Sequence, residues 1–192
     1  MNSQEQNWKL GTVHAGQDAA WAYEPSYAHQ VVGGVERLVI AGGDAPVTLL
    51  RELLEMLPAE LWVLYVLVTP RGSGNESAAG RYQSAQKHSR EDVLQLLDRY
   101  AEFLNGDGRH NLWLAAPPVG QLVYDRHDVI YAYGPLPSMI ELLKQKGFVE
   151  VEMVRVPVPH SHHYHERFDA DQDAMLQHWE WLKSDLQETD NL

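Results

Sequence analysis

The chain has 192 residues, with 15 Lys and Arg against 27 Asp and Glu, and a formal charge of −12. A surface this acidic repels nucleic-acid phosphates and anionic lipid headgroups, so we expect neither nucleic acid nor a membrane as a partner. The absence of cysteine excludes disulfides, thiolate nucleophiles and cysteine-type zinc sites, and together with the polar start of the chain it predicts a cytoplasmic protein.

Residues 1–30 are polar and irregular, yet they carry four large aromatic side chains: Trp8, Trp21, Tyr23 and Tyr27. Disordered tails are usually poorer in such residues. We therefore expect residues 1–30 to form an arm or small subdomain that packs through its aromatics, and residues 31–192 to form a single domain.

The pattern becomes regular from Val35 onward. Val35–Ala41 predicts a strand, and a helix is predicted from about Pro46 to Pro58 with Asp44 as its cap. Leu61–Val68 is apolar on both faces, which is typical of a central strand covered on both sides. The apolar stripe of the helix has spacings of three and four and consists of Val47, Leu50, Leu53, Leu54 and Leu57.

Residues 70–90 are rich in Gly and Ser and predict a long loop. Ser89 and Asp92 then form the pattern of a capping box, in which a side chain at each position satisfies a backbone N–H of the other. The helix behind this box carries an apolar stripe and is expected to end at residues 105–108, where Asn, Gly, Asp and Gly follow one another.

Three short strands are predicted next, at residues 111–116, 121–124 and 129–133, and their spacing is typical of an antiparallel meander. A helix follows with Ser138 and Glu141 as its capping pair, and Gly147 is expected to end it in a left-handed conformation.

Residues 148–158 alternate between apolar and polar side chains and predict the last strand, with a bulge where the phase slips. A final helix is predicted from the spacing of Met175, Trp179, Leu182 and Leu186. The sequence therefore predicts an α+β fold: a mainly antiparallel mixed sheet with helices packed on it, in a single domain.

Four of the ten histidines lie within residues 160–165. Imidazole is a common ligand of zinc and similar divalent ions, so the tract predicts a metal site made from His160, His162, His163 and His165. On an extended chain His160 and His162 point to one side, and a third ligand must then come from elsewhere, for example His178. The alternative is a solvated connector between the last strand and the last helix.

Two turns bring a carboxylate and an imidazole together, one with Asp107 and His110 and one with Asp125 and His127. Acid–base catalysis uses these groups, and a meander allows both turns to lie at one end of the sheet, so the four residues are candidate catalytic residues. The alternative is structural, because Asp is common in turns and Arg–Asp pairs there are usually surface ion pairs.

The long loop is basic in an otherwise acidic chain, and it precedes a helix N-terminus. Arg71 and Arg81 are therefore candidates for binding a phosphate or carboxylate, with a disordered loop as the alternative.

Two classes of function fit these features. The first is a non-enzymatic protein-binding or inhibitory module, favoured by sparse motifs, by an acidic surface that suits a basic protein partner, and by six Trp and nine Tyr. A homo-oligomer is compatible with the same features. The second is a metal-dependent hydrolase that holds zinc or another divalent ion at the C-terminal histidines.

Overall fold

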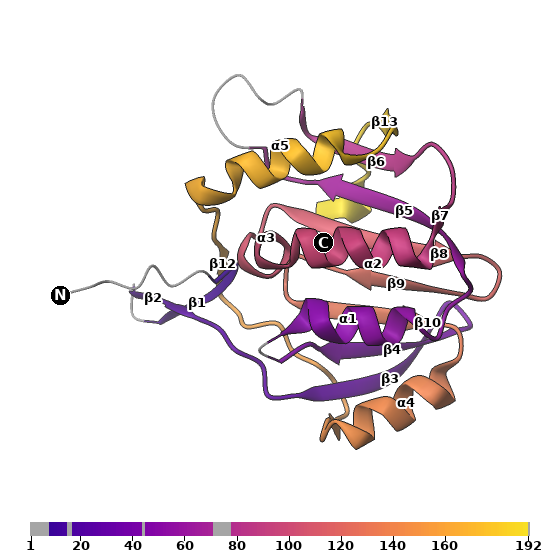
Figure 1. Ribbon diagram of the computed structural model, residues 1–192. Coiled ribbons are helices and arrows are strands. Elements are labelled where there is room, and N and C mark those ends of the chain that lie inside the picture. The colour runs from indigo at the N-terminus through magenta and orange to yellow at the C-terminus, as the bar shows by residue number, and fades with distance from the viewer. Residues whose placement is uncertain (1–7, 15–16, 44, 71–77, 192) are drawn as a thin grey trace.

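A large mixed sheet of ten strands organises the chain (Figure 1). The computed structural model describes residues 8–14, 17–43, 45–70 and 78–191. The order along the sheet is β11-β3-β4-β10-β9-β8-β5-β6-β13, and β7 pairs with β5. The strands are β3 (Ser26–Val32), β4 (Val35–Ala41), β5 (Glu60–Leu67), β6 (Gly80–Ser84), β7 (His88–Ser89), β8 (His110–Ala116), β9 (Gly120–Tyr124), β10 (Val129–Tyr133), β11 (Val149–Glu150) and β13 (Trp181–Ser184).

Every pairing in this sheet is antiparallel except that of β11 with β3. A small second sheet of order β12-β1-β2 lies at one end of the large one and contains β1 (Leu10–His14), β2 (Gln17–Ala20) and β12 (His160–His162). The predicted α+β class, with a mainly antiparallel mixed sheet and a single domain, is confirmed. The predicted division at residue 30 falls inside β3.

Helices pack on one face of the large sheet, with α1, α2 and α3 across its middle, α4 near β3 and α5 near β6 (Figure 1). The helices are α1 (Pro46–Leu54), α2 (Arg90–Arg99), α3 (Ala101–Gly106), α4 (Leu136–Gln145) and α5 (Asp169–His178), with 3-10 turns η2 (Glu166–Phe168) and η3 (Glu188–Asn191). The leucine stripe of α1 is buried against the strands, as its spacing predicts. None of the helices in the described part of the chain has the length and apolar character needed to cross a membrane.

The opposite face of the sheet carries half-buried aromatic and polar side chains. The strand register places Trp113 beside Val123 and Val123 beside Tyr131, so these side chains form a continuous row. We call this surface the open face and define it by Trp62, Leu64, Trp113, Val123, Tyr131 and Tyr133, each of intermediate exposure.

Several local predictions hold. The meander of β8, β9 and β10 is antiparallel throughout. Ser89 accepts a hydrogen bond from the Asp92 backbone N–H, and the Asp92 carboxylate accepts one from the Ser89 N–H, which completes the capping box of α2. Gly147 has φ +82° after α4, a conformation that side chains with a Cβ rarely adopt. Asp44, the predicted cap of α1, lies outside the described residues.

Other predictions are wrong. The strand expected over 148–158 is limited to β11, because the chain leaves the edge of β3 after the Val151 N–H donates to the Tyr27 backbone oxygen, and it continues as coil. The last helix ends at His178, and the predicted helical segment at 181–184 is instead β13 on the edge of β6. Part of the predicted loop over 70–90 is β6. The capping pair of α4 is also wrong, because this helix begins at Leu136 with no side-chain cap.

Candidate metal centre

The turn between β9 and β10 holds His127 in a fixed position. The Asp125 carboxylate accepts backbone N–H bonds through Oδ1 from His127 at 2.9 Å and from Val129 at 3.0 Å. Asp128 adopts a left-handed conformation with φ 61°, and its Oδ1 accepts a hydrogen bond of 2.7 Å from the Tyr124 hydroxyl. His127 is therefore a buried residue on a turn with few free backbone groups.

Lys9 fixes this turn through contacts of its side-chain ammonium group. Its ammonium group is buried and donates to the backbone oxygens of Leu104 at 3.2 Å and Asp125 at 3.0 Å. It also pairs with Asp128 Oδ1 at 3.1 Å and lies 3.7 Å from the centroid of the Tyr124 ring. A buried charge persists only where it is paired and hydrogen-bonded, and these contacts supply both requirements. They attach the N-terminal part of the chain to the His127 turn.

Strand β12 brings the C-terminal histidines to the same place. It pairs with β1, which sets His160 opposite Thr12 and His162 opposite Leu10. The approach at Gly108 is close, since a Cβ there would lie 2.8 Å from the Lys9 backbone oxygen and 3.2 Å from the His162 Cβ. Glycine at position 108 therefore allows β12 to lie against the start of β8.

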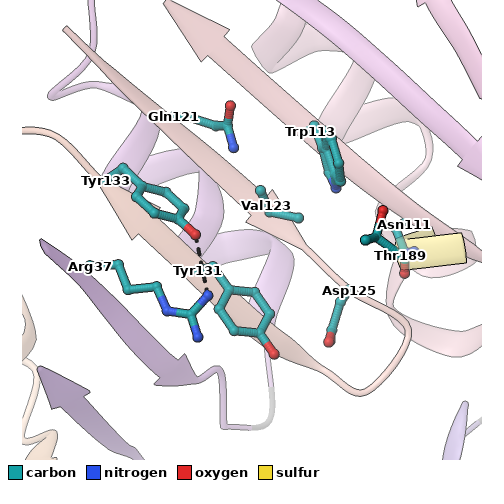
Figure 2. Close-up of a pocket in the computed structure, with 9 residues that line it drawn as sticks. All are labelled: Arg37, Asn111, Trp113, Gln121, Val123, Asp125, Tyr131, Tyr133 and Thr189. Carbon is teal, nitrogen blue, oxygen red and sulfur yellow. Dashed lines mark hydrogen bonds between the residues drawn. The ribbon is translucent and has the colours of Figure 1, made fainter. Parts of the chain in front are cut away.

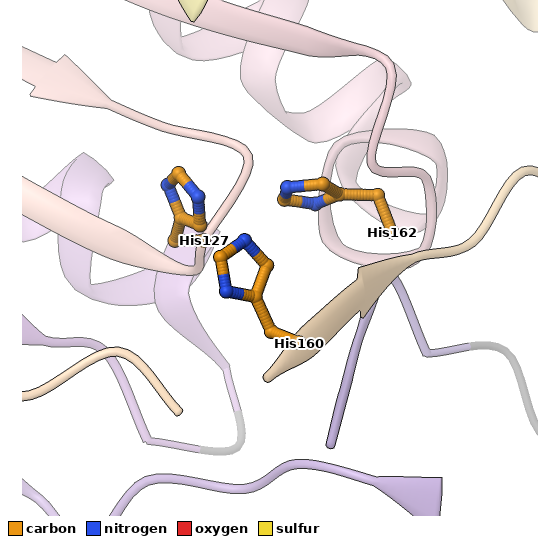
Figure 3. A group of neighbouring side chains, drawn as sticks. All are labelled: His127, His160 and His162. Carbon is orange, nitrogen blue, oxygen red and sulfur yellow. The ribbon is translucent and has the colours of Figure 1, made fainter. Parts of the chain in front are cut away.

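Three imidazoles converge at this junction: His127 from the β9–β10 turn, and His160 and His162 from β12 (Figure 3). One nitrogen of each lies within 4.8 Å of those of the other two. The ring centroids are 5.2 Å apart for His127 and His160, 4.9 Å for His127 and His162, and 5.2 Å for His160 and His162. Zinc–nitrogen bonds of about 2.0–2.1 Å in a tetrahedron require nitrogens roughly 3.3 Å apart, so the side chains must rotate to bring these nitrogens onto one ion.

Hydrogen bonds select the tautomer of two of these rings. His127 Nδ1 lies 3.0 Å from Asp125 Oδ2, and His160 Nδ1 lies 3.0 Å from the Pro157 backbone oxygen. A carboxylate or carbonyl oxygen accepts hydrogen bonds, so each Nδ1 carries the proton. In a neutral ring Nε2 then keeps its lone pair, as metal-binding histidines backed by an oxygen acceptor require.

His162 is held in the neutral form without any such partner. Both of its ring nitrogens are buried and make no hydrogen bond to another described residue. Burial lowers the pKa of His162 to about 3, and the positive charge of Arg126 and the neighbouring His127 and His160 lower it further in the same direction. A buried nitrogen without a partner is costly, and a metal ion would satisfy it.

The other histidines proposed as ligands lie elsewhere. His163 Nε2 is 2.8 Å from an Asp18 carboxylate oxygen, and its ring lies 3.8 Å from Trp8. His165 Nε2 is hydrogen-bonded to the Trp8 backbone oxygen at 3.1 Å. His178, the suggested third ligand, contacts the Tyr100 hydroxyl at 3.4 Å. In the described part of the chain, only His160 and His162 of this set join the cluster, and His127 takes the third position.

The four catalytic candidates take different roles in the structure. His127 is a member of the cluster, and Asp125 is the hydrogen-bond acceptor behind its ring. Asp107 instead forms a buried ion pair with Arg109 at 2.8 Å, and Arg109 extends it to Asp169 at 3.1 Å. His110 is enclosed between Phe103 and Tyr65, where burial lowers its pKa well below the usual value.

Of the two anion-binding candidates, Arg71 lies outside the described residues. Arg81 lies on β6, where its Nη1 is 2.6 Å from Asp190 Oδ1 and its guanidinium covers the Trp113 ring at 4.9 Å. The charge of Arg81 is therefore already paired within the chain.

The supporting residues give little signal in the sequence. Lys9 is one lysine between Trp8 and Leu10, and no motif there predicts that its ammonium group is buried. Tyr23 lies near the two carboxylates of the β9–β10 turn. Burial raises its pKa, and the negative charges of Asp125 and Asp128 raise it further. The spacing of Asp125 and His127 is the one local sign of a hydrogen bond behind a cluster histidine, because a carboxylate two residues before a histidine can fold back to its ring. Comparisons of the chain with protein-family models, with curated proteins and with solved structures find no match.

Proposed function

We propose that this protein binds a divalent transition metal, zinc foremost, through His127, His160 and His162, and that it is a metal-dependent hydrolase. The observation that supports this most is the convergence of three imidazoles, two of which have Nδ1 engaged by an oxygen acceptor. Nε2 of His127, Nε2 of His160 and one nitrogen of His162 are then the ligand atoms.

The ligand set supports a reactive site more than a purely structural one. Structural zinc sites usually have four protein ligands, whereas catalytic sites have three and leave one position open. His160 is an exposed residue, so solvent and substrate have access to the fourth position. A metal ion at such a site would supply a bound water of pKa ~7 and would polarise a carbonyl or phosphoryl oxygen.

Arg126 adds a preference among substrates. Its backbone N–H donates to Asn111 Oδ1 at 2.9 Å, and after burial its positive charge has the largest effect in lowering the pKa of His162. A positive charge close enough to lower the pKa of His162 also favours negative charge on a substrate bound at the cluster. The proposed hydrolase therefore acts on esters that carry or develop negative charge.

Metal analysis tests the first half of the proposal. The wild-type protein, stripped with chelator and reloaded, should hold one zinc per chain by elemental analysis, and a His160→Ala/His162→Ala double variant should hold none. A His29→Ala variant is the matched control, because His29 is exposed on β3. Zinc bound equally by wild type and double variant would overturn the metal centre.

Hydrolysis tests the second half. Zinc-loaded wild-type protein should cleave a p-nitrophenyl acetate or bis-p-nitrophenyl phosphate ester above the rate of free zinc, and chelation should abolish that rate. Stoichiometric zinc with no cleavage of either ester would retain the metal centre and overturn the hydrolase.

We propose a protein-binding module as the second candidate, on a separate observation. The hairpin of β3 and β4 exposes three valines at its tip, with Val31 65% exposed, Val32 52% and Val35 54%. β11 pairs with β3 only at Ser26 and Tyr27, which leaves the rest of that strand edge for another chain. The acidic chain favours a basic partner. Both candidates are proposed to act in the cytoplasm, which the lack of cysteine suits.

The hairpin tip can be tested by its effect on association. Sedimentation experiments measure whether the protein associates with a second copy or with a basic protein used as probe. A Val31→Ser/Val32→Ser variant should lose whichever of these associations the wild type shows. Unchanged sedimentation of both proteins, alone and with the probe, would overturn this candidate.

A further inference from the structure

A hollow of about 280 Å³ lies on the open face of the sheet, away from the helices (Figure 2). The Arg37 guanidinium lies at one side, the Trp113 indole at the other and Val123 between them, with Asp125 at the far end. Tyr131 and Tyr133 complete the wall on the side of Arg37. The volume is close to the lower end of small-molecule sites, which run from ~300 Å³ upward.

Arg37 is oriented but not neutralised. Its Nε and Nη2 donate to Gln30 Oε1 at 3.2 and 3.0 Å, and its Nη1 donates to the Tyr133 hydroxyl at 3.3 Å. No ion pair between described residues includes Arg37, in contrast to Arg81, which pairs with Asp190. These bonds leave one N–H on each terminal nitrogen of Arg37. A carboxylate is the group that matches a guanidinium held in this way.

The walls of the hollow are flat. The Arg37 guanidinium lies 4.9 Å from the centroid of the Tyr131 ring, so the guanidinium and this ring form the same wall of the hollow. The Trp113 indole stands opposite, and its other neighbour is Arg81 at 4.9 Å. Because Val123 forms a low floor between aromatic rings, a planar ring fits between Tyr131 and Trp113 better than a branched aliphatic group.

The far end rejects a second negative charge. The Asp125 carboxylate lies there with its oxygens already accepting from His127 and Val129. The Tyr131 hydroxyl makes no hydrogen bond to another described residue, and burial raises its pKa to about 12, so it stays neutral and can donate or accept. A neutral polar group on the ligand suits this end, whereas a dianion is repelled by Asp125.

We infer that this hollow binds a small aromatic monocarboxylate, with the carboxylate on Arg37, the ring between Tyr131 and Trp113, and a neutral hydroxyl or amino group directed toward Asp125 and the Tyr131 hydroxyl. This binding site shares Asp125 with the support of the histidine cluster, but it uses none of the three imidazoles and does not depend on a bound metal.

The test uses 4-hydroxybenzoate as probe and 4-hydroxybenzamide as its neutral counterpart, with the full chain after chelator treatment. Quenching of tryptophan fluorescence and isothermal titration should show saturable binding of the carboxylate with one site per chain. An Arg37→Gln variant should weaken binding of the carboxylate roughly tenfold or more, the order expected for a lost charge-assisted hydrogen bond, and leave the amide unchanged. Arg51→Gln is the matched control, because Arg51 lies on α1 and pairs with Asp98 at 3.0 Å.

A Trp113→Leu variant should weaken binding of the carboxylate and the amide alike, since it removes the wall and not the charge. Circular dichroism of each variant establishes that it is folded. Equal affinity of wild type and Arg37→Gln for the carboxylate, or no saturable binding at 10 mM probe, roughly the weak limit for a ligand of this size, would overturn the inference. Binding that appears only after zinc is added would also overturn it, because the probe would then be a metal ligand.

Discussion

Asp125→Asn is the most informative single change to the histidine cluster, because it alters the proton on one ring and little else. The wild-type carboxylate accepts backbone N–H bonds through Oδ1 and faces His127 Nδ1 through Oδ2 at 3.0 Å. An Asn can keep Oδ1 on the backbone groups, and its NH2 then faces His127 Nδ1. An NH2 donates, so Nδ1 must lose its proton and Nε2 must take it. The nitrogen that faces the cluster is then blocked.

The expected loss follows from the role of such partners. Removing an oxygen acceptor behind a metal-binding histidine weakens metal binding about 10–100-fold, which corresponds to ~1.4–2.7 kcal/mol. The fold should lose less, about 1 kcal/mol, because both backbone bonds of Asp125 are retained. The zinc Kd is measured at pH 7.5 by competition with a chromophoric chelator, and the free energy of unfolding by urea titration of the apo protein.

Asp98→Asn is the matched control, since Asp98 pairs with Arg51 on the helical face. Nitrogen NMR of the imidazoles gives an independent readout: His127 should carry its proton on Nδ1 in the wild type and on Nε2 in Asp125→Asn. A zinc Kd within twofold of wild type, or an equal loss in Asp98→Asn, would refute the reasoning.

Three further predictions concern the fold that supports the cluster. Lys9→Met should lower the free energy of unfolding, measured by urea titration, by about 3–5 kcal/mol, because it leaves two backbone oxygens and the Asp128 carboxylate without their cation. A loss under ~1 kcal/mol would contradict the buried ion pair of Lys9 and Asp128. His110→Leu should change stability at pH 7 by no more than about 1 kcal/mol, since neither ring nitrogen makes a hydrogen bond of normal geometry to a described residue and the ring packs among apolar groups. The pKa of His110 is lowered in the fold, so below pH ~6.5 the unfolded chain takes up a proton that the folded protein does not, and the free energy of unfolding falls with pH. The variant lacks this group, so its free energy of unfolding should decline less between pH ~6.5 and ~4. An identical decline in both proteins would count against a buried neutral ring. Ser89→Ala should cost about 1 kcal/mol in thermal or urea unfolding by removing the α2 cap, and Ser89→Asp, which keeps an acceptor, should restore most of it; no difference between the two variants would argue against the capping box.

Features that depend on neighbours in the sequence were predictable. The capping box joins Ser89 and Asp92, three residues apart, and the β8–β10 meander joins strands through short turns. Gly147 has a positive φ that follows from its place after a helix. In each case the determining contacts lie within a few residues, so residue type and spacing are sufficient.

Features that depend on a free sheet edge were not predictable. Residues 151–158 alternate like a strand, but alternation states which side chains share a face and not whether a partner edge is available. Residues 181–184 carry a helical spacing, yet β6 offers an unpaired edge and the chain extends along it as β13. Ladder hydrogen bonds to a distant strand outweighed local preference there.

By itself, the sequence determined the α+β class, the imidazole-rich segment and the shared side of His160 and His162, because these follow from periodicity, composition and the alternation of an extended chain. Only the tertiary structure decided which third histidine meets them. His127 is 33 positions before His160, and it reaches the cluster because β12 pairs with β1 and the buried Lys9 holds the β9–β10 turn. Such a meeting is set by long-range packing, which no local pattern encodes.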